Sequence, residues 1–135
     1  MIECRMPFQA LQKAVCDLLK TYQSAPVYEY VTLNTKPPYL TFGDIHLVDA
    51  GAKDVALYAV EMEVYAYSRA HTRREINEMI DDTATILSSA APDLEADDYI
   101  VVAQDITDAN TSPSEVEGYT GRLLVTFQIQ DIHDR

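Results

Sequence analysis

Apolar side chains recur every three or four positions along residues 8–22. This spacing brings them to one side of an α-helix, so it predicts a helix with one buried face that starts near Pro7. The apolar positions of this stripe are Phe8, Leu11, Val15, Leu18, Leu19 and Tyr22.

The hydrophobic period changes from two to about 3.6 between residues 60 and 82. From about Val55 to Ser68, apolar residues alternate with acidic and aromatic ones, which predicts a strand with one buried face. A helix is expected to follow, because Thr72 and Glu75 have the capping-box spacing in which each side chain bonds the other's free amide. This helix should end before Pro92, and its buried positions should be Ile76, Met79, Ile80, Thr83, Ile86 and Leu87.

Four further segments have the pattern of strands, and they are residues 25–33, 39–47, 99–106 and 119–132. Residues 48–54 have the composition of a turn and residues 107–118 lack any apolar period, so both are predicted to be mobile loops. Gly43 is expected at a β-bulge. The predicted order is α-β-β-β-α-β-β in a single domain over residues 1–135. This order indicates an α+β fold, a mostly antiparallel sheet of about five strands with two helices packed on one face.

The composition fits one packed domain, since the chain has 135 residues and 47% hydrophobic content. A chain of this length folds without help from a metal or a disulfide. No apolar run approaches the ~20 residues of a membrane span, and the N-terminal residues do not form a secretory signal. We therefore expect a protein made in the cytoplasm, with no membrane partner.

The net charge is −12, and the acids are concentrated in residues 92–135, where ten of them accompany only Arg122 and Arg135. Such a surface repels phosphate backbones, which argues against tight binding of DNA or RNA.

The residue types that carry catalysis or bind metals do not gather in this sequence. The three histidines are isolated from one another and from the two cysteines, so no metal-ligand spacing is present. Residues 93–98 are rich in acids, but an EF-hand loop needs Gly at its sixth position and Glu at its twelfth. Those positions hold Asp98 and Gln104, and the four glycines form no phosphate-binding motif. The sequence therefore predicts no enzyme and no cofactor.

Three of the ten basic residues lie at the junction between the long strand and the second helix, and they are Arg69, Arg73 and Arg74. Arginines in a first helical turn oppose the helix dipole, so we expect an acidic partner to offset that cost. One alternative is pairing within the chain, as between Arg74 and Glu78 at i,i+4 spacing. The other is that the three arginines form a patch that meets an acidic surface of another subunit, in a head-to-tail ring. Candidate acidic surfaces are residues 93–98 and 105–117.

The ordered combination of these segments resembles the tail terminator, or tail-to-head joining (tail completion), proteins of long-tailed bacteriophages. The resemblance covers residues 8–132, and no single motif in it is diagnostic. The segments that carry it are "LQKAVCDLLK", "PVYEYVTLNTKPPYLTFGD", "VYAYSRAHTRREINEMIDDTATIL" and "GRLLVTFQI". The chain departs from the family in its strong acidity, its lack of tryptophan and its lead-in "MIECRMP".

The resemblance implies a structural virion protein, located at the head-proximal end of the tail and without catalytic activity. Members of the family assemble as a ring, usually of six subunits, that ends the tail tube and docks on the head connector. The implied partners are further copies of the chain, the tail tube protein and the head completion (stopper) protein, with DNA passing through without specific binding.

A ring of this kind needs a lumen that does not hold DNA, and carboxylates supply that by repulsion. Glu61 and Glu63 are the candidates for lining the lumen, and the alternative is that they face bulk solvent or pair with an adjacent strand. Residues of the segment 107–118 are the candidates for ordering on assembly, namely Asp108, Asn110, Ser112, Glu115 and Glu117.

Two other functions stay open at this point. One is an acidic DNA mimic that inhibits a basic host protein, with one face of the second helix as the phosphate substitute. A mimic needs a dense and rigid carboxylate array, whereas many acids of this chain lie in predicted loops or beside arginines. The other is a neighbouring ring of the same neck, such as the head completion protein. The carboxylates of the mimic face would be Glu75, Glu78, Asp81 and Asp82.

Overall fold

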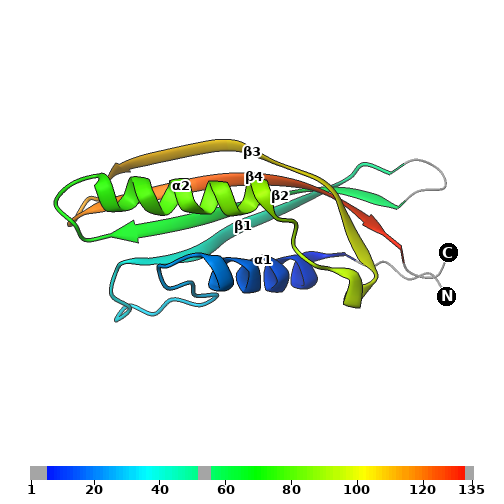
Figure 1. The fold of residues 1–135 in the computed structure, drawn as a ribbon, viewed down its shortest axis with the longest axis horizontal. Coiled ribbons are helices and arrows are strands. Elements are labelled where there is room, and N and C mark those ends of the chain that lie inside the picture. Colours follow the sequence, from blue (N-terminus) through cyan, green and yellow to red (C-terminus); the bar gives the residue numbers. More distant parts are fainter. Residues whose placement is uncertain (1–5, 52–55, 133–135) are drawn as a thin grey trace.

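The computed structural model describes residues 6–51 and 56–132, in which a layer of helices covers a β-sheet (Figure 1). The elements in chain order are α1 (Phe8–Tyr22), β1 (Tyr39–Asp49), β2 (Leu57–Ser68), α2 (Arg74–Ser89), the 3₁₀ helix η1 (Glu95–Asp97), β3 (Tyr99–Pro113) and β4 (Tyr119–Asp131). The helix predicted for residues 8–22 is confirmed at both ends.

The strands form one sheet in the order β1-β2-β4-β3, and every neighbouring pair is antiparallel. The apolar stripes of both helices and alternate residues of the strands make a single core, which confirms an α+β fold with the helices on one face. At Gly121 of β4, α2 comes so close that an added Cβ would lie 2.6 Å from the side chain of Ile80. The core includes Leu11, Leu19, Met62, Ile76, Leu123 and Phe127, all fully buried.

The described sheet has four strands rather than about five, because residues 25–33 do not form one. Val27 makes an isolated parallel bridge to Leu40, with the N–H of Tyr28 donating to the carbonyl of Leu40 at 2.9 Å. Pro26, just before this bridge, has no N–H to add to a ladder, and the chain then turns away from β1. The β propensity of the segment was therefore a misleading signal.

The expectation of a loop over residues 107–118 is wrong for its first part, since β3 continues to Pro113. Register shifts between Val101 and Ala103 and between Ile106 and Asp108 break the strand's alternation. β3 is also an edge strand with polar residues on both sides in its second half, so no apolar period marks it.

The other predicted loop, residues 48–54, is also shorter than expected, because Val48 and Asp49 pair with β2 as part of β1. Residues 52–55 lie outside the described residues, so the mobility of this loop stays a prediction. The bulge predicted at Gly43 is confirmed by a register shift between Phe42 and Ile45. In the described part of the chain, no helix has the length and apolar content that crossing a bilayer requires.

Candidate assembly surfaces

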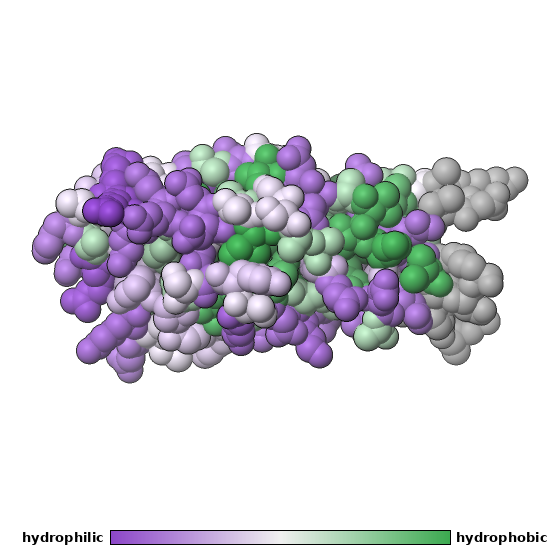
Figure 2. Space-filling view, viewed as in Figure 1, coloured by the Kyte–Doolittle hydropathy of each residue, from purple (hydrophilic) through white to green (hydrophobic). Residues whose placement is uncertain are grey.

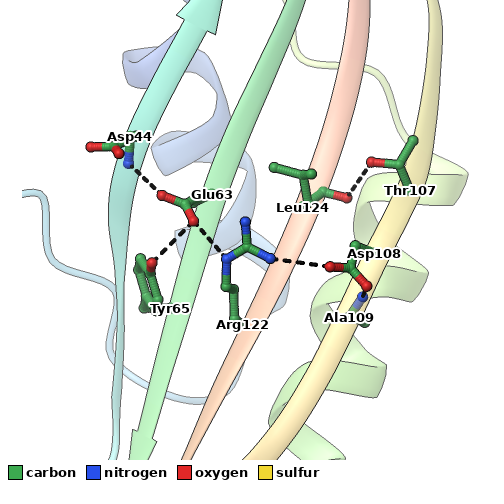
Figure 3. Close-up of polar contacts among 8 residues, drawn as sticks. All are labelled: Asp44, Glu63, Tyr65, Thr107, Asp108, Ala109, Arg122 and Leu124. Carbon is green, nitrogen blue, oxygen red and sulfur yellow. Dashed lines mark hydrogen bonds and ion pairs between the residues drawn. The ribbon is translucent and has the colours of Figure 1, made fainter.

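The face of the sheet that points away from the helices carries a row of charged side chains across three strands (Figure 3). Arg122 on β4 donates through Nε to Oε2 of Glu63 on β2 at 2.6 Å, and through Nη1 to Oδ2 of Asp108 on β3 at 3.2 Å. Strand register explains the row, because Glu63 and Asp108 both lie opposite Leu124 of β4. Arg122 is two positions along on the same face, within reach of both.

Glu63 accepts two further hydrogen bonds. The N–H of Asp44, in the bulge of β1, donates to its Oε1 at 3.0 Å, and the hydroxyl of Tyr65 donates to its Oε2 at 3.0 Å. The hydrogen bond from Arg122, above all, lowers the pKa of Glu63 below its ordinary value, although partial burial opposes this. Burial, and next the hydrogen bond to this carboxylate, raise the pKa of the Tyr65 phenol. The carboxylate therefore stays charged and firmly held.

The two glutamates predicted to line a channel both lie on this face, but their surroundings differ. Glu61 is exposed, whereas the side chain of Glu63 keeps only 15% of its surface exposed. Glu63 pairs with Arg122 of the adjacent strand β4, which is the alternative considered for these residues. A lumen position for either residue stays a prediction.

Four tyrosines form a second feature, which runs from the segment before β1 onto this face. Ring centroids are 5.9 Å apart for Tyr28 and Tyr39, 5.0 Å for Tyr39 and Tyr67, and 6.4 Å for Tyr67 and Tyr65. Burial raises the pKa of the Tyr39 phenol, with Tyr67 adding to the effect. Tilted and offset contacts at these distances add to strand pairing.

Sequence reasoning missed this tyrosine row and the role of Arg122. Tyr65 and Tyr67 are two positions apart on β2, and Arg122 is the one basic residue of β4. The alternating pattern could therefore have placed all three on the polar side of a strand. Their partners could not be named because they come from strands distant in sequence.

The start of α2 differs from the predicted capping box of Thr72 and Glu75. The helix begins at Arg74 without a side-chain cap, and the hydroxyl of Ser68 donates to the carboxylate of Glu75 at 2.6 Å. The same hydroxyl accepts a hydrogen bond from the N–H of Ala70 at 3.1 Å. Ser68, buried at the end of β2, thus takes the hydrogen bond to the Glu75 carboxylate that was predicted for Thr72.

The three arginines at this junction contact residues of their own chain. Arg74 pairs with Glu78 at 3.2 Å, as predicted for i,i+4 spacing, and its side chain is 84% exposed. Arg69 lies 3.8 Å from a carboxylate oxygen of Glu117. Arg69 and Arg74 thus each have an acidic partner within the chain, while the side chain of Arg74 stays largely exposed.

Arg73 joins α2 to the strands beside it. Its Nη1 donates to the carbonyl of Thr111 at 3.1 Å, and its guanidinium lies 5.2 Å from the ring centre of Tyr119. The hydroxyl of Thr111 in turn donates to Oδ1 of Asn77 at 3.1 Å. Arg73 thereby holds the end of β3 and the start of β4 against the start of α2.

Of the residues predicted to order on assembly, Asp108, Asn110 and Ser112 lie in β3, where they pair with β4. Glu115 and Glu117 lie in the β3–β4 turn (residues 114–118) and are exposed. Their role in assembly stays a prediction, but only these two belong to a turn.

The acidic face of α2 that a DNA mimic would use is partly neutralised. Glu75 accepts a hydrogen bond from Ser68 and Glu78 pairs with Arg74, whereas Asp81 and Asp82 are exposed. Within the described ranges, no three potential metal ligands come together.

A comparison with protein families places the chain among known proteins. The family described as "Tail completion protein gp17" matches residues 8–129, a span with both helices and nearly the whole sheet. This match defines the class, a structural protein of the bacteriophage virion tail. The chain belongs to the tail completion protein gp17 family. The resemblance predicted from the sequence is thereby confirmed.

Two solved structures share the fold. One is a chain of "Virion of native gene transfer agent (GTA) particle", with a TM-score of 0.81 and 18% identity, covering 94% of this chain and 99% of that chain. The other is "Structure of bacteriophage SPP1 gp17 protein", with a TM-score of 0.60 and 18% identity, covering 96% of each chain. No curated protein matches the sequence.

Proposed function

We propose that copies of this chain form a ring, of six subunits, that ends the tail tube and joins it to the head. The partners are further copies of the chain, the tail tube protein on one side and the head completion protein on the other. Membership of the tail completion family supports this role. The likeness to a chain of a gene transfer agent particle supports the fold that the role requires.

The observation that best supports DNA passage is the composition of the sheet face that points away from the helices. In the described residues no helix covers this face. It bears Glu61 and Asp105, and Glu63 and Asp108 that share Arg122, with His46 of β1 opposite Glu61. A wall with this excess of carboxylates repels a DNA duplex and lets it move without being held. We therefore assign this face to the DNA passage.

The arginines at the start of α2 are proposed to act between subunits as well as within one. Arg74 is the best placed, because its pair with Glu78 is exposed and costs little to exchange. The acidic segments 93–98 and 105–117 of a neighbouring copy are the candidate partners, in a head-to-tail arrangement that closes on itself.

Electron microscopy of particles produced without this chain tests the role. We expect tails of irregular or excessive length, or tails that are not attached to full heads. Supplying the chain from a second gene should restore joined particles. Particles of normal tail length and normal attachment in its absence would rule the role out.

A further inference from the structure

The arm (residues 28–36), between α1 and β1, holds an apolar side chain out in solvent. The N–H of Thr35 donates to the carbonyl of Thr32 at 3.1 Å, and the N–H of Thr32 donates to the hydroxyl of Thr35 at 3.1 Å. These bonds close a turn with Leu33 and Asn34 at its tip. Leu33 is 106% exposed relative to a reference leucine, so it adds nothing to the core of its own chain.

The base of the arm is fixed to the sheet. The hydroxyl of Thr41 donates to the carbonyl of Tyr28 at 2.8 Å, next to the backbone bond between Tyr28 and Leu40. The ring of Tyr28 also packs against Tyr39. A side chain presented on a fixed base loses little freedom when it docks, which favours binding.

One exposed leucine is ordinary on a soluble protein, so its meaning depends on whether a matching surface exists. Such a surface lies between the end of α1 and the second half of α2, where a pocket of about 270 Å³ opens to solvent. The exposed surface inside this pocket is apolar. Figure 2 shows apolar side chains gathered between the two helices on this face. The groove is lined by Tyr22, Thr85, Ile86, Ser89 and Ala90.

These two surfaces differ from most of the molecule in having no charge to repel another copy. Copies of a chain with a net charge of −12 repel one another over most of their surface. Neither the turn at residues 32–35 nor the lining of the groove has a charged side chain. The two can meet without placing acid against acid.

We propose that Leu33 of one copy inserts into the groove of a second copy. Because Leu33 and the groove are different parts of the chain, the contact runs head to tail and can continue from copy to copy around a ring. This inference rests on the ring proposed above and names the apolar contact between its subunits.

Disulfide trapping in assembled particles tests the contact. In a Cys4→Ser chain, Leu33→Cys and Ser89→Cys are introduced together, mild oxidant is added, and products are separated by mass without reductant. We expect a ladder of covalent oligomers of this chain. Each single variant, Leu33→Cys or Ser89→Cys, should give at most dimers. A cross-link to a protein of another mass would assign the groove to a different occupant and overturn the proposal.

Two charge variants give a matched comparison without cysteines. Leu33→Asp should reduce incorporation into particles roughly tenfold or more, because a leucine side chain loses its burial. Asn34→Asp adds the same charge one position along the turn and should assemble normally. Both residues lie at an exposed tip, so both variants should keep the melting temperature of the native chain.

These results separate the contact from the ring itself. Rings seen by electron microscopy, with no ladder from the double cysteine chain and normal incorporation of Leu33→Asp, would overturn the contact alone. Particles whose tails end and join normally in the absence of the chain would overturn the ring, and the contact with it.

Discussion

Three donors from three strands converge on the carboxylate of Glu63. They are the guanidinium of Arg122, the hydroxyl of Tyr65 and the N–H of Asp44. Because these groups belong to β4, β2 and β1, the carboxylate ties neighbouring strands on a face that no helix covers. Its charge is thus used inside the subunit, and Glu61 is the glutamate of β2 that presents its charge to the surroundings.

Replacement of Glu63 tests this difference through pH. Its folded-state pKa lies below the ordinary value of 4.5, so its carboxylate stabilises the fold fully above that pH. This contribution is lost as the pH falls through the lowered folded-state value. Glu63→Gln should therefore lower the melting temperature at neutral pH, and its difference from the native chain should shrink in acid.

Glu61→Gln on the same strand is the control, and it should melt close to the native chain at neutral pH because Glu61 is exposed. Circular dichroism over a series of pH values measures all three chains. An equal effect of the two substitutions at every pH would contradict the role assigned to Glu63.

The β3–β4 turn, the start of α2 and the end of β2 behave as one structural unit at one end of the molecule (Figure 1). Arg73 bonds Thr111 and lies over Tyr119, while Gly118 passes directly beside the backbone of Ser68. A Cβ at Gly118 would lie 1.9 Å from the carbonyl oxygen of Ser68, and its φ of +81° is one that glycine alone adopts easily.

We expect Gly118→Ala to lower the free energy of unfolding by at least about 2 kcal/mol, from backbone strain and the clash with a carbonyl that cannot move aside. Chemical denaturation measures the loss. Glu117→Ala, one residue away, removes only an exposed ion pair and should change stability by about 0–1 kcal/mol. Equal stabilities for the two variants would show that the turn is not packed as described.

Prediction from sequence succeeded where a regular period reports on burial. The helix at residues 8–22 and the strands β2 and β4 have one side buried in a common core, so their patterns are regular. It failed at residues 107–113, where a register shift at Ile106/Asp108 and an exposed edge removed the period. It also failed at residues 25–33, which have β propensity but form only an isolated bridge to β1.

The candidate site was harder to predict than the fold, because its contacts join residues far apart in sequence. Arg122 and Glu63 are separated by 59 positions, and their pairing depends on strand order, which no local pattern reports. The pair of Arg74 with Glu78 was predictable since helix geometry alone sets it.

At the scale of the whole molecule, charge works against assembly of the free protein. Each copy carries −12, so the proposed ring of six would place a large negative charge in a small volume. The contacts that offset this repulsion are proposed to form at the end of the tail tube, where the ring gains partners.

Sedimentation of the purified chain at low salt measures the balance. We expect a monomer or a small oligomer there, since repulsion is weakly screened when the Debye length exceeds ~10 Å. Added salt should shift the distribution toward larger species. A stable hexamer at low salt would show that subunit contacts outweigh the charge without help from the tube.

The order β1-β2-β4-β3 has a geometric outcome that an odd number of strands would not have. Since each neighbour reverses direction, the two outer strands, β1 and β3, run opposite ways. If identical copies stood edge to edge about an axis parallel to the strands, β3 of one copy would meet the opposite-running β1 of the next. That polarity is the one required for a continuous alternating ladder from subunit to subunit. With five alternating strands, the two outer strands would run in the same direction, and neighbouring copies would meet as parallel strands.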